Sequence, residues 1–152
     1  MPPVAFNYTE TPVKVSSDRS GGGSAVWIHF GGKAAGYADW YTECGLQGRP
    51  GDTAYAHCQI AQSQGDNWND EYQTPGIPVN YDTWYTLRIE TNPATANMQF
   101  FLDNTLLGNH TPKDAAALLS ANALSPRLAA LNFDQGGKST RYVDDVRITP
   151  AR

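Results

Sequence analysis

Aromatic and planar polar side chains alternate along several strand-like segments of the chain. Tyr41 and Glu43 alternate in one segment, and Tyr55, His57 and Gln59 alternate in another. A pyranose ring has an apolar C–H face that stacks on an aromatic ring, and its hydroxyl groups both donate and accept hydrogen bonds. Carboxylate, amide and imidazole groups satisfy such hydroxyl groups when they are held in fixed positions. These residue types therefore indicate a surface suited to sugar recognition.

Three further residues complete the candidate ligand-binding set. Arg88 lies in a third alternating segment, and Trp68 and Tyr72 lie where they can form stacking platforms at the rim. Together the expected residues of one concave sheet and its rim are Tyr41, Glu43, Tyr55, His57, Gln59, Trp68, Tyr72 and Arg88. The alternative is that the aromatic rings only cover a sheet, while Arg88 pairs with Glu90 or Glu43 for under ~1 kcal/mol.

The apolar residues between these positions predict the face that is buried. Side chains of a strand alternate between two faces, so an inward Cys44 brings Thr42 and Leu46 with it, and an inward Cys58 brings Ala56 and Ile60. Two other segments are expected to point inward with Tyr85, Leu87, Ile89, Met98, Phe100 and Leu102. We expect two packed sheets to share a core made of Leu87, Ile89, Phe100, Leu102, Val146 and Ile148.

Strand patterns with turn residues between them follow one another along the whole chain. The weakly patterned first strand is expected around Val4–Tyr8, and residues 16–24 form a polar turn. The other expected strands are Pro12–Val15, Ala25–Phe30, Tyr37–Gln47, Ala54–Ala61, Asn67–Thr74, Trp84–Thr91, Asn97–Leu102, Thr105–Leu107, Arg127–Phe133 and Tyr142–Ile148. One short helix is predicted over 112–120, because Thr111 can cap it and Pro112 suits the first helical position. We expect one all-β domain over residues 1–152.

Composition supports an all-β class and excludes several partners. Charged residues make up only 17% of the chain, and 14 Gly and 10 Pro divide it into short segments, which favours strands over helices. The net charge of −4 argues against nucleic acid, because no basic stripe is present to neutralise phosphates. No apolar run approaches the ~20 residues that span a bilayer. We expect any export signal or neighbouring domain to lie outside this chain.

The two cysteines lie in neighbouring strand-like segments. Cys44 and Cys58 flank a loop that allows the segments Tyr41–Gln47 and Ala54–Ala61 to pair. A disulfide between them would close a ~15-residue loop and stabilise the fold by about 3 kcal/mol. The alternative is two buried free thiols in a cytosolic protein. We expect the disulfide and an extracellular or cell-surface location, since the spacing suggests neither a metal site nor catalysis.

Three motifs in the second half of the chain resemble a known superfamily. Residues 84–90 read WYTLRIE, residues 98–108 read MQFFLDNTLLG, and residues 142–148 read YVDDVRI. In this order they resemble the C-terminal half of concanavalin A-like lectin/glucanase (LamG-like) jelly rolls. The resemblance implies a two-sheet antiparallel jelly-roll sandwich. It is specific to architecture, because this fold carries sugar binding, glycan cleavage and adhesion alike.

Three functions are compatible with that superfamily. The expected one is a non-catalytic carbohydrate-binding module of a larger exported protein, with a glycan or polysaccharide as its partner. The alternatives are a LamG-type adhesion domain or a small glycan-active hydrolase or lyase. The E-x-D-x-x-E motif of the related glucanases is absent from the sequence, as are the motifs of jelly-roll alginate lyases. An enzyme would need a carboxylate pair such as Glu43 with Glu71 or Glu90.

The resemblance also raises a metal site near the end of the chain. Jelly-roll binding modules with a similar closing strand often place one of its aspartates on a structural calcium ion, and Asp144 and Asp145 match that motif. The alternative is that Asp144 accepts hydrogen bonds from nearby backbone N–H groups while Asp145 faces solvent. No cofactor is expected to be required. His110 is expected to be a surface residue.

Overall fold

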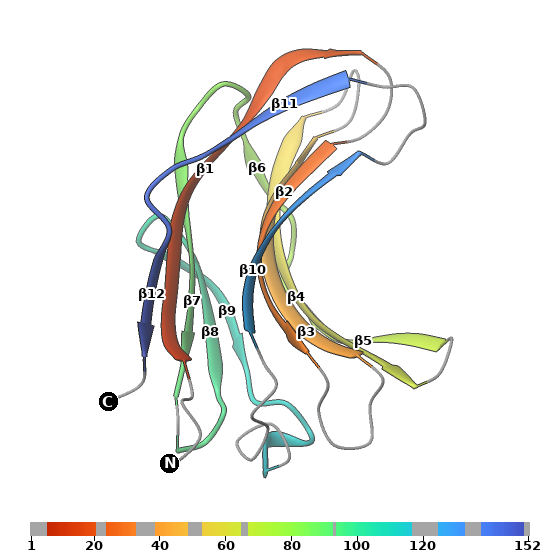
Figure 1. Cartoon of the computed structure of the whole chain (residues 1–152), viewed down its shortest axis with the longest axis vertical. Coiled ribbons are helices and arrows are strands. Elements are labelled where there is room, and N and C mark those ends of the chain that lie inside the picture. Colours follow the sequence, from red (N-terminus) through yellow and green to blue (C-terminus); the bar gives the residue numbers. More distant parts are fainter. Residues whose placement is uncertain are drawn as a thin grey trace.

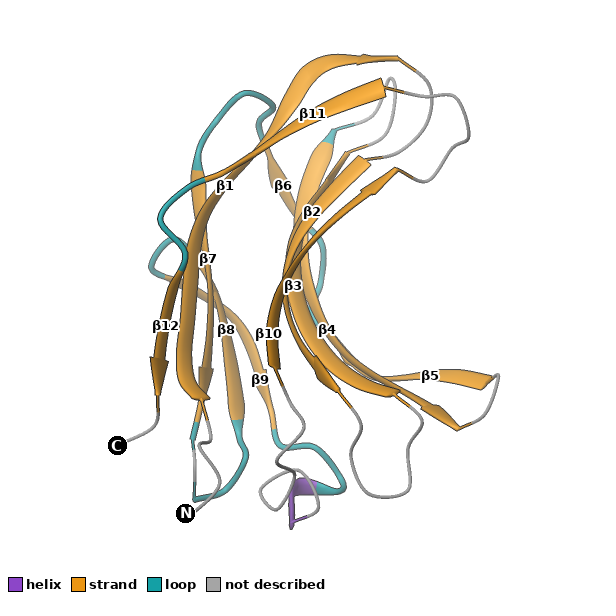
Figure 2. Cartoon of the chain, viewed as in Figure 1, coloured by secondary structure: helices purple, strands orange, loops and turns teal. Residues whose placement is uncertain are grey.

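A computed structural model of the chain describes residues 6–20, 24–32, 39–48, 53–64, 67–92, 94–116, 125–132 and 138–150. Most of these residues belong to strands (Figure 2), which pair in antiparallel fashion into two sheets. The prediction of an all-β jelly-roll sandwich with two antiparallel sheets is confirmed. Within the described part of the chain, no helix is long and apolar enough to cross a membrane.

Sheet A contains the first strand and most of the strands from the second half of the chain. Its strand order is β11-β1-β7-β8-β9, and β12 also pairs with β1. The strands are β1 (Phe6–Ser20), β7 (Tyr85–Thr91), β8 (Met98–Leu102), β9 (Thr105–His110), β11 (Lys138–Val143) and β12 (Arg147–Pro150).

Sheet B packs against sheet A and has the strand order β10-β2-β3-β4-β5, with β6 pairing with β4. Its strands are β2 (Ser24–Gly32), β3 (Asp39–Gly48), β4 (Ala54–Gln64), β5 (Asn67–Gln73), β6 (Ile77–Val79) and β10 (Ser125–Asn132). This sheet is strongly curved, and its concave side faces away from sheet A (Figure 1).

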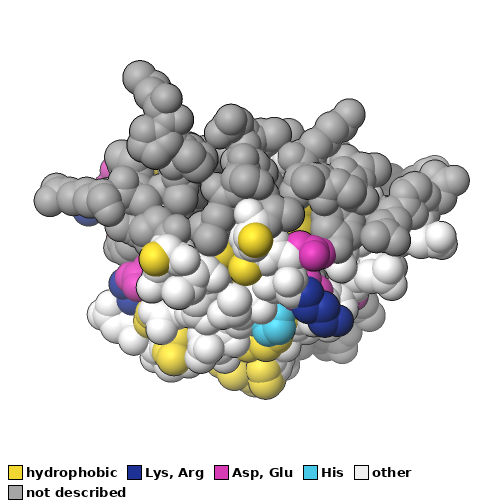
Figure 3. Space-filling view, turned by 90° about the horizontal axis from the view of Figure 1, so that it is seen from below, with side chains coloured by type: hydrophobic (Ala, Val, Ile, Leu, Met, Phe, Trp, Pro, Cys, Tyr) yellow, Lys and Arg dark blue, Asp and Glu magenta, His cyan; other side chains and the backbone are white. Residues whose placement is uncertain are grey.

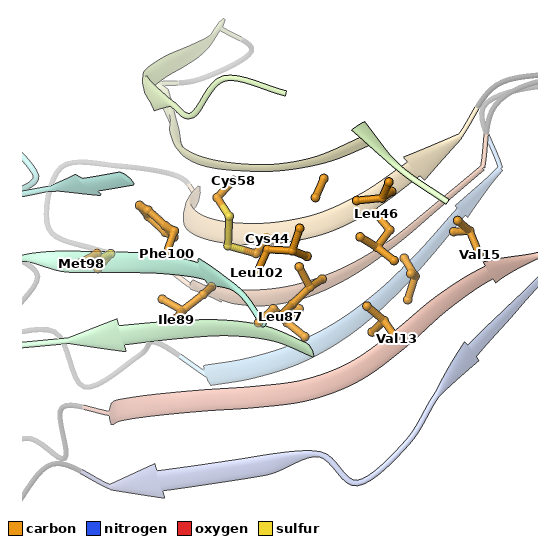
Figure 4. Close-up of a cluster of buried hydrophobic side chains, with 14 of the residues drawn as sticks. Val13, Val15, Cys44, Leu46, Cys58, Leu87, Ile89, Met98, Phe100 and Leu102 are labelled. Atoms are coloured by element: carbon orange, nitrogen blue, oxygen red, sulfur yellow. A yellow bond between two sulfur atoms is a disulfide. The ribbon is translucent and has the colours of Figure 1, made fainter. Parts of the chain in front are cut away.

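The core lies between the sheets and follows the predicted alternation. Thr42, Cys44, Leu46, Ala56, Cys58, Ile60, Leu87, Ile89, Met98, Phe100 and Leu102 are all buried, as predicted. The predicted disulfide between Cys44 and Cys58 is also confirmed; it lies in this core among Leu87, Phe100 and Leu102 (Figure 4). The two cysteines face each other directly in the β3–β4 ladder.

The first strand is longer than the sequence pattern predicts. The structure has one continuous strand, β1, where the sequence suggested two short strands and a polar turn that begins at Ser16. β1 pairs with β7 on one side and with β11 and β12 on the other, so neighbouring strands satisfy its backbone groups on both sides. Its irregular register with β11 between Val15 and Arg19 lets the strand continue through the polar residues.

The closing segment 142–148 is interrupted instead of forming one strand. β11 and β12 are separated by residues 144–146, where Asp145 has a positive φ of 38°. Val146 and Ile148 are 42% and 40% exposed, so the prediction that they belong to the core is wrong. The reason is the position of this segment at the edge of sheet A, where β12 pairs with β1 alone.

Part of the predicted helix over 112–120 falls within the described residues. They form a turn and then the helical residues Ala115 and Ala116, while residues 117–120 lie outside the described part (Figure 2). The backbone N–H of Lys113 donates to Glu71 Oε1 at 2.6 Å. A carboxylate from β5 therefore accepts the hydrogen bond that was predicted for the Thr111 side chain.

Candidate functional site

The candidate site is the concave face of sheet B. Because Cys44 and Cys58 point into the core, their strand neighbours Glu43, His57 and Gln59 lie on the opposite, concave face. The β3–β4 register places Glu43 directly across from Gln59. The structure thus brings together five of the predicted site residues, which are Tyr41, Glu43, Tyr55, His57 and Gln59.

A row of hydrogen-bonded polar side chains crosses this face from β2 to β5. His29 Nδ1 lies 3.2 Å from Glu43 Oε2, and Gln59 Nε2 donates to Glu43 Oε1 at 2.7 Å. Gln73 Nε2 lies 3.3 Å from Gln59 Oε1 and donates to Asp70 Oδ2 at 2.8 Å. We call His29, Glu43, Gln59, Gln73 and Asp70 the polar row. Glu43 is 9% exposed, so the row holds a nearly buried carboxylate at a fixed position.

Aromatic rings flank the polar row on both sides. On one side the ring of Tyr41 stacks on His29 with a centroid distance of 5.1 Å. On the other side Tyr55 stacks on His57 at 5.6 Å, and Trp27 meets the same imidazole edge-on at 4.7 Å. Polar groups in a row between aromatic faces match the two surfaces of a sugar ring.

Gly45 allows Trp27 to occupy its place on the concave face. The two residues are opposite each other in the β2–β3 ladder, and a Cβ atom at position 45 would overlap the indole ring. The missing side chain therefore leaves the space in which the indole lies against the sheet.

Burial and local charge control the protonation of two site residues. Burial, reinforced by the negative charges of Glu43 and Asp70, raises the pKa of Tyr41 to about 12. Burial lowers the pKa of His57 in spite of the opposing effect of Glu43. At neutral pH the phenol is therefore protonated, and the neutral imidazole is favoured. Within the described residues, His57 Nδ1 and Trp27 Nε1 are buried without a hydrogen-bond partner.

Two residues on β2 were missed in the sequence. Trp27 and His29 alternate with the fully buried Val26 and Ile28, so they lie on the concave face of the strand. The same period of two that placed Tyr41 on this face could have found them.

A β-bulge explains why Asp70 and Gln73 of β5 were also missed. The β4–β5 register shifts at this point: Tyr72 is opposite Ile60, whereas Asp70 is opposite Ala61. Glu71 is the extra residue, and the shift places Asp70 beside Gln73, to which it is hydrogen bonded. A strict alternation cannot predict this exchange.

Arg88 does not belong to the concave face, so its predicted place there is wrong. It lies on β7 in sheet A, where it pairs with Glu90 and its guanidinium carbon lies 3.9 Å from the centroid of the Phe101 ring. A period of two identifies the outward residues of a strand but does not say to which sheet the strand belongs.

The structure also corrects the predicted stacking platform at Tyr72. Its ring stacks on Phe100 at 6.0 Å and on His110 at 4.8 Å, so it packs between the sheets and not at the rim of the concave face. Its position opposite the inward Ile60 is the reason. The backbone of Trp68 belongs to β5, and its side chain lies outside the described residues.

Glu71 ties the two sheets together at one end of the sandwich. Its side chain is 1% exposed, and Oε1 lies 3.0 Å from His110 Nε2 and accepts from the Lys113 backbone. His110 is therefore a partly buried member of β9, in contrast to the predicted surface residue. A view of this end (Figure 3) shows a histidine beside hydrophobic side chains, with acidic and basic groups nearby. Because Glu71 points to this junction and Glu90 lies in sheet A, neither forms a pair with Glu43.

The two carboxylates proposed for calcium are engaged in other interactions. Asp144 Oδ1 accepts from the backbone N–H of Asp145, and Asp145 Oδ2 accepts from Arg147 Nε at 3.0 Å. Within the described residues, no group of three or more acidic, histidine or cysteine side chains is placed to hold a metal ion. A calcium ion takes 6–8 oxygen ligands, and its binding at these two aspartates stays a prediction.

Solved structures with the same architecture share little sequence with this chain. The carbohydrate-binding module CBM66 from Bacillus subtilis has a TM-score of 0.52 at 10% identity, covering 95% of this chain and 75% of that one. LamAcat from Zobellia galactanivorans has a TM-score of 0.59 at 16% identity, covering 95% and 64%. The Crh5 transglycosylase in complex with NAG has a TM-score of 0.61 at 18% identity, covering 98% and 66%.

These similarities define the fold of the chain. It has the concanavalin A-like jelly-roll fold that its sequence motifs resemble. No protein-family model matches the chain, and no curated protein matches it. The chain spans 64% of LamAcat and 66% of the transglycosylase.

Proposed function

We propose that this domain binds a glycan on the concave face of sheet B without cleaving it. The observation that carries the proposal is the polar row with aromatic rings on both sides. A carboxylate and two amides are held by one another, so they present hydrogen-bonding groups to sugar hydroxyls with little further loss of side-chain freedom. Carbohydrate binding by the CBM66 module, which shares the fold, is consistent with this function.

The protonation states of the flanking residues favour hydrogen bonds between uncharged side chains and the sugar. Tyr41 keeps its proton, so its hydroxyl can donate to a sugar oxygen, and a neutral His57 can donate or accept according to its tautomer. Tyr55, which stacks on His57, offers a ring face for a pyranose. Trp68 as an additional stacking platform stays a prediction.

We further propose that the domain acts outside the cell as one part of a larger protein. The buried disulfide between Cys44 and Cys58 supports this location, since structural disulfides persist in oxidising compartments. The glycan would then be a polysaccharide or a glycan on a surface, which the domain would hold for its neighbours. Calcium is not needed for this mode of binding.

A glycan array with the intact domain, followed by titration of the best ligand, tests the proposal. Ring stacking and a few hydrogen bonds should give a dissociation constant of about 10 µM to 1 mM. Tyr55→Ala and Glu43→Gln should each weaken binding at least several-fold, and Trp68→Ala should do the same. Arg88→Ala is the matched control, because Arg88 lies in the other sheet.

Three outcomes would contradict the proposal. Release of reducing sugar from the bound glycan, lost in Glu43→Gln, would make the domain a glycan-active enzyme. Failure to retain any glycan would favour an adhesion domain of the LamG type. Binding that is unaffected by both Tyr55→Ala and Glu43→Gln would show that the concave face is only a solvated sheet surface.

A further inference from the structure

A second aromatic cluster lies on the outer face of sheet A, on the opposite side of the sandwich from the polar row. Trp84, which directly precedes β7, and Tyr142 on β11 are 45% and 40% exposed. Their ring centroids are 6.2 Å apart and the rings meet at an angle of 63°. Two large aromatic rings from distant parts of the chain therefore form one exposed surface.

Lys14 on β1 lies between the two rings. The register pairs Lys14 with Tyr142, and the β1–β7 ladder ends at the pair Val13–Tyr85, directly beside Lys14 and Trp84. Lys14 Nζ lies 4.2 Å from the centroid of the Tyr142 ring and 5.2 Å from that of Trp84. These cation–π contacts orient both rings and hold the ammonium group between them.

A second cation–π pair on the same outer face contains a less exposed ring. The Arg88 guanidinium lies 3.9 Å from the centroid of the Phe101 ring, and Phe101 is half-buried. Trp84 and Tyr142 are more exposed than Phe101 although they share a cation. The contact with Lys14 thus leaves apolar ring surface available to a ligand.

We propose that Trp84, Lys14 and Tyr142 form a second glycan contact that takes a neutral sugar ring. The C–H face of the sugar would stack on the indole, and the ammonium and phenol groups would reach its hydroxyls. A neutral ring fits better than an acidic one, because two exposed carboxylates offset the positive charge of Lys14: Asp82 interacts with that charge, and Asp144 follows Tyr142 by two residues. The inference rests on the proposed function only because the same kind of glycan is expected on both faces.

A domain with contacts on opposite faces would hold two sugar chains at once. Two weak sites raise the retention on an insoluble polymer far more than the affinity for a short soluble oligosaccharide. Loss of either site should therefore lower both the number of oligosaccharides bound per domain and the retention on the polymer, and each site can be removed by its own substitution.

Titration calorimetry of the intact domain with N-acetylchitohexaose, cellohexaose and laminarihexaose, with uronic acid hexamers for comparison, tests this site. We expect a stoichiometry of two for a neutral oligosaccharide. It should fall to one in Trp84→Ala, to one in Glu43→Gln, and to none in the double variant. Tyr142→Ala should weaken the outer-face site at least several-fold. Leu106→Ala removes another exposed apolar side chain of sheet A and should change nothing.

The outcomes separate this inference from the proposed function. A stoichiometry of one that only Glu43→Gln abolishes would overturn the second site and leave the concave site in place. A stoichiometry of one that only Trp84→Ala abolishes would support the outer site and contradict the concave one. Trp84→Phe keeps a ring, so it should retain binding if Trp84→Ala loses stability. Self-association of the intact domain that Trp84→Ala removes would assign this surface to a second copy and overturn the inference.

Discussion

On the concave face of sheet B, aromatic rings flank side chains that hydrogen-bond to one another across four strands. On the outer face of sheet A, Trp84 and Tyr142 surround a single ammonium group and stay exposed. The first arrangement directs several polar groups, so under the proposed function it should distinguish one sugar from another. The second offers mainly ring surface and few directed groups, so it should bind with less specificity. The difference shows that aromatic exposure alone does not indicate how selective a sheet surface is.

The largest expected effect lies in the core that supports both faces. Ile89→Ala should lower the free energy of unfolding by ~2–5 kcal/mol, because it removes buried methyl groups and leaves a cavity. Ile148→Ala, at the exposed edge, should cost well under that, about 1 kcal/mol or less. Urea denaturation of both variants measures the difference. A loss for Ile89→Ala under about 0.5 kcal/mol would contradict the assignment of the core.

Gly45→Ala should damage the concave face alone. The new methyl group must displace the Trp27 ring, so we expect a destabilisation of ~1–3 kcal/mol together with weaker glycan binding at the polar row. Gly76→Ala is the control, since its Cβ would approach Tyr55 Cδ2 only to 3.4 Å. Binding at Trp84 should be unchanged in both variants. Equal affinity of Gly45→Ala and the intact domain would argue that Trp27 has no part in the site.

Lys14→Met should damage the outer face alone. It keeps most of the side-chain volume but removes the cation, whose contacts with exposed rings are worth about 0.5–1 kcal/mol. We expect a few-fold weaker binding on the outer face and a correspondingly small loss of stability. Lys113→Met removes a different exposed lysine and should have no effect on either quantity. Stronger outer-face binding in Lys14→Met would mean that the ammonium only covers the rings.

A smaller effect is expected from the protonation of His57. Its pKa is lowered in the folded domain by burial, so the unfolded chain binds the proton more readily. The contribution of the neutral His57 to stability should therefore be fully present above the unfolded pKa of about 6.5. It should fall as the pH drops from there toward the lowered pKa of the folded state. Denaturation between pH 7.5 and 5 measures the slope, which should be shallower in His57→Gln. An identical slope in that variant would assign the pH dependence to other groups.

Calcium should have the smallest effect of all. Asp145 accepts from Arg147 and Asp144 accepts from the backbone, so a metal ion would have to compete with contacts that both carboxylates already make. We expect the same melting temperature in excess calcium and in excess chelator. A clear rise with calcium would show that the Arg147 contact gives way to a metal site.

The sequence predicts correctly those strands in which side chains alternate strictly between the two faces of the sheet. Cys44, Cys58, Leu87 and Phe100 are apolar residues of strands with a partner on each side, and their burial and the disulfide follow from alternation. The same rule placed Tyr41, Glu43 and His57 on the correct face. Where neighbouring strands enforce the pleat, local pattern and three-dimensional position agree.

The mistakes arise where long-range pairing decides. Arg88 has the expected outward direction, but only the strand order shows that its sheet is not that of Glu43. The bulge at Glu71 and the positive φ of Asp145 each shift the alternation locally, and neither leaves a signal in hydrophobicity. Ile148 is apolar, yet its place beside β1 at the sheet edge leaves it exposed.

The disulfide has a consequence for the concave face beyond its contribution to stability. A slip of β3 against β4 by one residue would turn every side chain of the slipped strand to the opposite face. The covalent link holds Cys44 opposite Cys58, and Glu43 must then stay opposite Gln59. The disulfide thus fixes the β3–β4 register that aligns the polar row. A reduced domain could keep much of its β-structure while losing the pairing on which the polar row depends.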